Sequence, residues 1–113
     1  DIAQQIRNER DRRIHTSGYK VGANWFHSDQ TSRIQQIGLV MMGASIPAGL
    51  QWKTMGGAKV TMTPTLAQQV FAAAAVQDAT HHAVSDAAIA AAAATPNFDL
   101  RSIAWPEGFV ATK

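Results

Sequence analysis

The sequence lacks cysteine, is short of charged residues and has no long hydrophobic run. The absence of cysteine among its 113 residues excludes disulfide frameworks, thiolate metal sites and cysteine nucleophiles. Charged residues make up 16%, below the ordinary share of about 25%. Apolar residues make up 46%, which excludes a solvated disordered tail. No stretch reaches the ~18 consecutive apolar residues of a membrane span, so we expect no membrane partner. The length predicts one domain with a core of its own.

Charge is unevenly distributed along the chain. Residues 1–59 contain eight Lys and Arg against four Asp and Glu, a net charge of +4. Residues 60–113 contain two against four, a net charge of −2, and no Lys or Arg occurs between positions 60 and 100. This mild dipole favours association with another protein over binding a nucleic acid, which needs a concentrated basic face.

Alanine is abundant and localised, with 14 of the 21 alanines in residues 64–94. Thr63 and Pro64 predict the start of a helix there, as N-cap and first helical residue, and residues 95–97 predict its end. At 1.5 Å per residue this helix is about 46 Å long, whereas a compact chain of this size is about 35 Å across. We therefore expect its end to project or to lie against another chain.

Two interpretations of this long helix are open. Its large apolar residues share an arc of about 140°, which favours a first half packed on hairpins and a remainder that is helical by propensity. A 4-3 spacing that starts at Leu66 resembles a heptad seam of small residues, which favours an oligomer seam. The second interpretation and the apolar anchors of the tail together predict a partner interface, formed by Val84, Ala87, Ala91, Phe98, Ile103, Trp105 and Phe109.

The rest of the chain predicts two further helices and two hairpins. Residues 1–14 form a polar helix that is marginal alone, and the first residue is Asp, so we expect this helix to continue an upstream segment of a longer protein. Residues 18–27 and 50–62 alternate around glycine turns and predict hairpins. A helix over 29–44 is capped by Asp29. The predicted fold class is α+β in the order α-ββ-α-ββ-α, with one domain over 1–95 and an irregular C-terminal strap over 96–113.

The same patterns predict which residues form the core. The helix over 29–44 is apolar around most of its circumference, so it is expected to be buried on more than one side. Most of the core is predicted to consist of Trp25, Phe26, Ile34, Ile37, Met41, Trp52, Val60, Leu66, Val70 and Phe71.

No pattern in the sequence specifies catalysis or a cofactor. His82 is four residues from both Asp78 and Asp86, a spacing that can hold a metal weakly, but packing and ion pairs on the helix surface are the favoured interpretation. His27, Ser28 and Asp29 are adjacent in the sequence, but a catalytic triad is assembled in space, so Asp29 is interpreted as a helix cap. We therefore expect no enzyme activity, no catalytic residues, no cofactor and no metal.

A run of arginines in the first helix is the best candidate for nucleic-acid binding. Arg7, Arg10, Arg12 and Arg13 are interleaved with two acidic residues, and no aromatic residue stands among them to stack on bases. A solvated helical face is the favoured interpretation, and a phosphate-binding face is the alternative.

Several short segments together resemble a known family. Residues 18–22 and 26–29 match a Gly-aromatic-x-x-Gly…Phe-x-Ser/Ala-Asp pattern. Residues 48–54 match the Ala-Gly-x-x-Trp-x-Thr part of a Pro-Ala-Gly-x-x-Trp-x-Thr segment, and residues 60–63 match the entry to an alanine-rich final helix. Over residues 1–95 the chain resembles the domain-of-unknown-function family found toward the C-terminus of tailed-bacteriophage and prophage tail proteins.

The resemblance implies a structural protein of the phage tail. It implies residence in the virion after synthesis in the bacterial host cytoplasm, and partners among tail-fibre or baseplate proteins in a homo- or hetero-oligomer. The family has no established catalytic residues to carry over. The alternatives are a tail-fibre assembly chaperone and a nucleic-acid-binding module that uses the arginine-rich helix. A hydrolase of host-surface glycans is the least favoured alternative, because the sequence contains no carboxylate pair typical of such enzymes.

Overall fold

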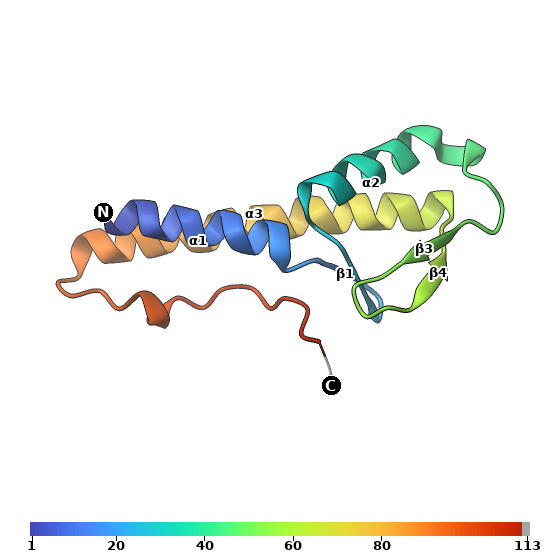
Figure 1. Ribbon diagram of the computed structural model, residues 1–113. Helices are drawn as coiled ribbons and strands as arrows, with labels where there is room; N and C mark the ends of the chain where they lie inside the picture. The colour runs from blue at the N-terminus through green and yellow to red at the C-terminus, as the bar shows by residue number, and fades with distance from the viewer. Residues whose placement is uncertain (112–113) are drawn as a thin grey trace.

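The computed structural model describes residues 1–111 and confirms the α+β class and the predicted order of elements. Three helices and two small hairpins follow one another along the chain (Figure 1). Their bounds are α1 Ile2–Thr16, β1 Tyr19–Val21, β2 Asn24–Phe26, α2 Gln30–Met42, β3 Gln51–Lys53, β4 Lys59–Thr61 and α3 Pro64–Ala94, with short 3-10 turns at Gly43–Ser45 and Leu100–Ser102.

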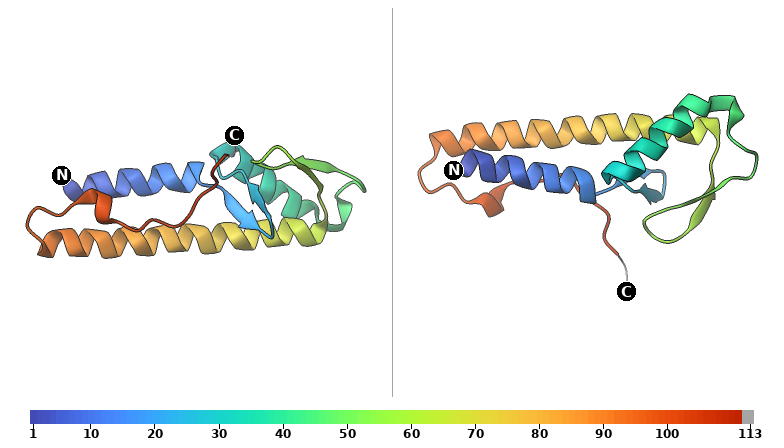
Figure 2. Two further views of the ribbon diagram at one scale, coloured as in Figure 1. Left: turned by 90° about the horizontal axis from the view of Figure 1, so that it is seen from below. Right: turned by 45° about the horizontal axis from the view of Figure 1, so that its top comes forward.

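Helix α3 is the spine of an elongated molecule measuring 56 × 33 × 21 Å. Helix α1 runs antiparallel along its C-terminal half, and α2 crosses its N-terminal half beside the hairpins (Figure 2). The predicted span of 64–94 is confirmed. The C-terminal end of α3 was expected to project or to lie against another chain. Instead, α1 and the C-terminal strap of the same chain lie along this end.

Local capping fixes where the helices begin. The side chain of Thr63 accepts a hydrogen bond from the backbone N–H of Leu66 at 3.0 Å, and Pro64 takes the first helical position. Asp29 accepts a hydrogen bond from the N–H of Ser32 at 3.1 Å. Each cap satisfies a backbone donor that the first turn leaves unpaired, so both helix starts could be predicted from the sequence.

The two hairpins are antiparallel pairs that contact each other. In β1–β2 Lys20 pairs with Trp25, and the Trp25 carbonyl accepts a hydrogen bond at 2.8 Å from the N–H of Met55, in the turn between β3 and β4. Gly18 precedes β1 with a φ of +82°, and a Cβ there would run into the Met55 sulfur. Glycine is therefore required both for the backbone conformation and for this close approach.

The core prediction is confirmed for part of its residues. Phe26 and Val70 are buried, and Trp52, Val60 and Leu66 are half-buried against the same cluster. Trp25 is also half-buried. The core further includes apolar residues that the sequence analysis did not name, which are Ile6, Ile14, Tyr19, Leu39, Ile46, Met62, Ala67 and Ala88.

The core prediction is wrong for four apolar residues of α2 and α3. Ile34 is 64% exposed, Ile37 47%, Met41 82% and Phe71 47%. Helix α2 turns Arg33, Gln36 and Leu39 toward α3 instead, about one residue around the helix from the predicted stripe. An apolar circumference does not identify the inward face, and here polar contacts of the inward residues decide it.

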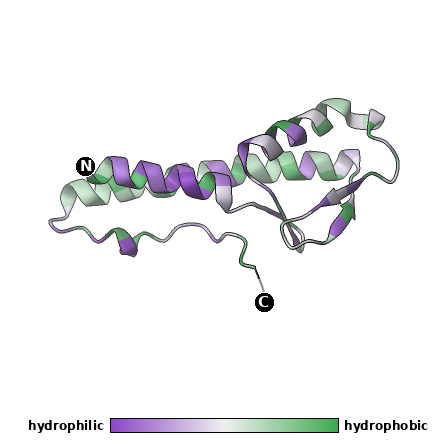
Figure 3. Cartoon of the chain, in the orientation of Figure 1, coloured by the Kyte–Doolittle hydropathy of each residue, from purple (hydrophilic) through white to green (hydrophobic). Residues whose placement is uncertain are grey.

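The colouring by hydropathy separates the two helices of the long arm. Helix α1 is largely hydrophilic, whereas the facing end of α3 is pale green with alanine (Figure 3). Among residues 1–111, no helix combines the length and the hydropathy needed to cross a membrane.

Candidate functional site

The main exposed apolar surface lies on α2 and the first half of α3. We define the α2–α3 face as Ile34, Ile37, Met41 and Phe71, the four residues whose burial was predicted and not found. The three residues of α2 lie three and four positions apart and so share one side of the helix. Ile37 and Phe71 line the same hollow between the two helices. A clustered apolar face of this kind is typical of a protein-contact surface.

The hollow in this face has a volume of about 200 Å³. Its remaining lining is provided by Tyr19, Arg33, Gln36, Ala74, Ala75 and Asp78. Small-molecule sites usually enclose about 300–1,000 Å³, so this one has room for a single side chain rather than a metabolite.

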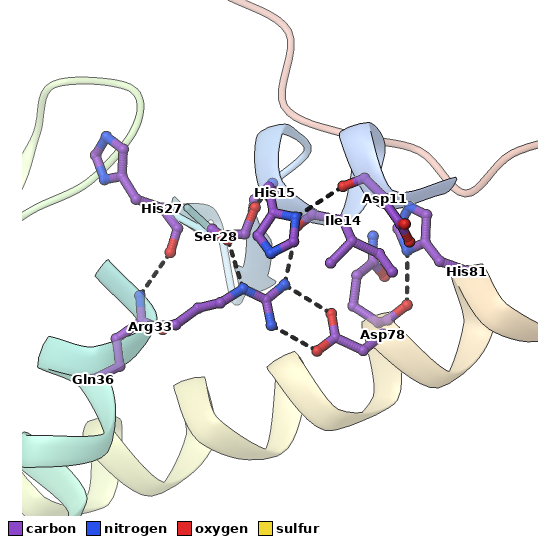
Figure 4. A network of polar contacts seen from close by, with 11 residues as sticks. Asp11, Ile14, His15, His27, Ser28, Arg33, Gln36, Asp78 and His81 are labelled. Carbon is purple, nitrogen blue, oxygen red and sulfur yellow. Dashed lines mark hydrogen bonds and ion pairs between the residues drawn. The ribbon is translucent and has the colours of Figure 1, made fainter. Parts of the chain in front are cut away.

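A polar clasp around Arg33 holds the helices beneath this face. The Arg33 guanidinium donates two hydrogen bonds to the carboxylate of Asp78 on α3, at 2.8 and 3.0 Å (Figure 4). It also donates to the carbonyls of Ser28 at 2.6 Å and Ile14 at 3.1 Å. One side chain of α2 thereby connects the C-terminal end of α1, the loop before α2 and the middle of α3. The two parallel hydrogen bonds between Arg33 and Asp78 join opposite charges, and such bonds are stronger than hydrogen bonds between neutral groups.

Further hydrogen bonds fix the rotation of α2. The Gln36 amide donates to the His27 carbonyl at 2.7 Å, and the Ser28 hydroxyl accepts from the N–H of Gly18 at 2.9 Å (Figure 4). Gln36 and Ser28 are both buried. Because buried polar groups must be paired, these bonds hold Gln36 inward and leave Ile37 at the surface.

Tyr19 lies beneath the clasp and is completely buried. Its ring faces the guanidinium carbon of Arg33, 5.1 Å from the ring centroid. Burial raises the pKa of the Tyr19 phenol, an effect that the positive charge of Arg33 partly opposes. Within residues 1–111 its hydroxyl has no hydrogen-bond partner. Its ring thus fills the space between β1, α2 and α3 and lines the hollow.

Trp105 anchors the C-terminal strap to the long arm. Its ring stacks on that of His81 with a centroid separation of 6.5 Å, and the Arg13 guanidinium lies 5.4 Å from its centroid. His81 is completely buried, and its Nδ1 lies 2.8 Å from the Gln77 carbonyl. The tryptophan thus contacts both helices of the long arm, α1 through Arg13 and α3 through His81.

Backbone contacts continue the strap beyond Trp105. The N–H of Phe109 donates to the Ser17 carbonyl at 2.8 Å, and the Gln77 amide donates to the Glu107 carbonyl at 3.3 Å. A Cβ on Gly108 would lie 2.9 Å from the Cβ of Ser17, so a larger residue would push the strap away from α1.

The predicted interface residues therefore fall into two groups. Ala87 and Ala91 are exposed on α3, whereas the other five, including Trp105, are half-buried. Ile103 and Trp105 line a hollow of about 360 Å³ between the strap and α1. The strap anchors thus contact helices of their own chain, and their use by a partner stays a prediction.

The arginine run of α1 is partly paired with carboxylates of its own helix. Glu9 accepts hydrogen bonds from Arg12 at 2.7 Å and from Arg13 at 2.6 Å, and Arg10 pairs with Asp11 at 2.8 Å. The bond from Arg12 is the main reason that the pKa of Glu9 falls to about 2. Guanidinium groups held by carboxylates are less available for phosphates, but the run keeps a net charge of +2, so the nucleic-acid alternative stays a prediction.

The histidine and aspartate residues of α3 do not form one cluster. Asp78 is held by Arg33 and His81 is buried under Trp105, whereas His82 and Asp86 are exposed. Among residues 1–111, no group of three or more His, Cys, Asp and Glu is placed to hold a metal ion.

The Arg33–Asp78 pair was missed by the sequence analysis, although the sequence contains a signal for it. Arg33 is the one charged residue between Asp29 and Lys53, and Asp78 is the one charged residue between Lys59 and Asp86. Single opposite charges in two apolar segments are candidates for a pair, because burying either charge alone is costly.

Comparison with known protein families identifies the family of this chain. Residues 1–104 match the family described as Domain of unknown function (DUF4376). The chain belongs to this family. The match to the DUF4376 family extends beyond the predicted domain end at residue 95 and includes the first part of the strap. No curated protein and no solved structure matches the chain significantly.

Proposed function

We propose that this member of the DUF4376 family is a non-enzymatic structural domain of a bacteriophage tail. It joins tail-fibre or baseplate proteins through protein contacts and resides in the virion. The tail context rests on the motif resemblance described above. The docking role is supported by one observation, the α2–α3 face, where Ile34 and Met41 are 64% and 82% exposed. Large apolar side chains clustered on a small domain are typical of surfaces that another protein covers.

Particle incorporation tests this proposal. Met41→Lys places a charge at one end of the α2–α3 face, at a side chain too exposed for the change to unfold the domain. Gln35→Lys is the matched control, because it adds the same charge to the same helix at an exposed position off the face. Mass spectrometry of purified particles should find the wild-type chain and the Gln35→Lys variant, and little of the Met41→Lys variant.

The same particles distinguish the assembly chaperone. A chaperone binds the fibre during folding and is then lost, so it would co-purify with unassembled fibre protein and be missing from mature particles. A chain that is missing from particles and binds no co-encoded tail protein contradicts both forms of the proposal. The nucleic-acid alternative requires salt-sensitive binding in a gel-shift assay, lost in Arg7→Gln and Arg10→Gln variants.

A further inference from the structure

We propose that the α2–α3 face binds a second copy of this chain, with the two α2 helices antiparallel about a two-fold axis between Ile37 and Gly38. The inference rests on this face being a protein-contact surface, as proposed above, and does not depend on the tail context. It names a second copy of the chain as the occupant of the face, which corresponds to the homo-oligomeric form of the predicted assembly.

The charges around the face favour a second copy over a different partner. The charged residues that line its hollow are Arg33 and Asp78, which pair with each other at 2.8 Å. Residues 34–52 and 60–77 contain no charged residue at all. In a two-fold interface each patch meets itself, so charges of one sign near the axis repel their own copies. A neutral face avoids that cost, and it also lacks the charges by which an interface selects an unlike partner.

The spacing of the apolar side chains fits an antiparallel pair. Ile34, Ile37 and Met41 are separated by three and then four residues, which is the a–d–a spacing of a heptad. The midpoint between Ile34 and Met41 lies between Ile37 and Gly38. Turning a copy of α2 end over end about that point places Ile34 of one chain opposite Met41 of the other, and sets the two copies of Ile37 side by side across the axis.

The hollow beside the stripe supports close contact between the copies. It is lined by Ala74 and Ala75, whose small side chains let an approaching helix come near the backbone of α3. Its volume of about 200 Å³ accepts one side chain from the second copy. Phe71 at 47% exposure forms part of its rim, so pairing would also remove an aromatic ring from water.

The oligomeric state of the purified chain tests the proposal. Sedimentation equilibrium or light scattering should show a dimer that dissociates on dilution. Ile34→Glu and Met41→Lys should each weaken it about 100-fold, because each buries an unpaired charge in the interface. Gln35→Lys, exposed on α2 but off the stripe, should leave it unchanged. Circular dichroism verifies that each variant keeps its helices, since Ile34 and Met41 are 64% and 82% exposed in one chain.

A double variant tests the antiparallel geometry itself. With Ile34→Glu and Met41→Lys in one chain, the two new charges have opposite sign and face one another twice across the axis. Dimerisation should recover to within about ten-fold of the wild type. Single variants that dissociate without recovery in the double variant would overturn the antiparallel pairing.

Other outcomes overturn the proposal more directly. A wild-type chain that is monomeric at about 0.5 mM, where even a weak dimer is populated, excludes a second copy as the occupant. A dimer that Met41→Lys leaves intact places the interface elsewhere. A monomer whose Met41→Lys variant is lost from particles leaves the proposed docking function standing and refutes only the self-association.

Discussion

The two halves of α3 are packed differently. In the half beside α2 and the hairpins, Val70 is buried, but the large residues Phe71 and Val76 are 47% and 67% exposed. In the half beside α1 and the strap, the buried residues are His81, Ser85 and Ala88, at 0%, 0% and 8% exposure. Large apolar residues thus lie at the surface of one half, whereas small and polar residues lie inside the other.

The difference follows from how close the covering element can come. Small side chains such as Ser85 and Ala88 let the backbone of α1 approach α3, and the approach itself removes both residues from water. Helix α2 is positioned by the Arg33 clasp and leaves the side of α3 that carries Phe71 uncovered. Hydrophobicity alone therefore does not tell which residues of α3 are buried, and among its alanines only Ala67 and Ala88 are buried.

Enlarging a small residue under α1 should have the largest effect. Ser85→Leu inserts a branched side chain where exposure is zero, and should lower the free energy of unfolding by about 3 kcal/mol. Chemical denaturation measures this change. Ala87→Leu, exposed and two residues away, should change it by less than about 0.5 kcal/mol. Equal effects of the two variants would show that α1 does not pack closely.

Breaking the clasp between the two halves should have the next largest effect. Asp78→Asn removes the counter-charge of Arg33, whose side chain is 22% exposed, and should cost about 2 kcal/mol of stability. Asp86→Asn is the control, because Asp86 is exposed on the same helix. A wild-type unfolding midpoint for Asp78→Asn would mean that the pair does not position α2.

Removing the strap anchor should have a smaller and more local effect. Trp105→Ala deletes the contacts with His81 and Arg13, and should cost about 1 kcal/mol. Amide hydrogen exchange should accelerate at Phe109, whose N–H bonds to Ser17, and stay unchanged in α2. Val110→Ala, at a side chain 78% exposed, provides the control. Unchanged exchange at Phe109 in the Trp105 variant would show that the strap is held elsewhere.

The smallest predicted effect is a dependence of stability on pH through Glu9. Its pKa is about 2 in the folded chain against 4.5 normally, so the carboxylate binds protons less readily when folded. Its stabilising contribution is present above pH 4.5 and is lost as the pH falls toward 2. Glu9→Gln should cost roughly 0.5 kcal/mol at pH 7, as exposed ion pairs do, and nothing near pH 2. A constant difference across this pH range would assign the effect to packing rather than to charge.

The elements of the fold could be predicted because their signals are local. Thr63 and Pro64 mark the start of α3 within two residues, and Asp29 marks that of α2. The glycines of the two hairpin turns lie in the predicted places. Each of these signals acts over a few residues, so no tertiary contact was needed to read them.

The arrangement of the elements depends on contacts that local patterns do not contain. The inward face of α2 is set by Arg33 and Asp78, 45 positions apart in the sequence. The covering of α3 by α1 depends on Ile6 and Ile14, two buried residues on a helix that is otherwise polar. Two apolar side chains give a weak periodic signal, so the close packing of α1 was not foreseen.

The order of the strap contacts determines how the strap comes off under load. Along the strap, Phe109 bonds to Ser17, Glu107 to Gln77, and Trp105 stacks on His81. The strap runs antiparallel to α3, so tension applied at residue 111 meets these contacts one at a time (Figure 2). We therefore expect the strap to come away one contact at a time rather than all at once, and to expose the imidazole of His81 while the helices stay joined.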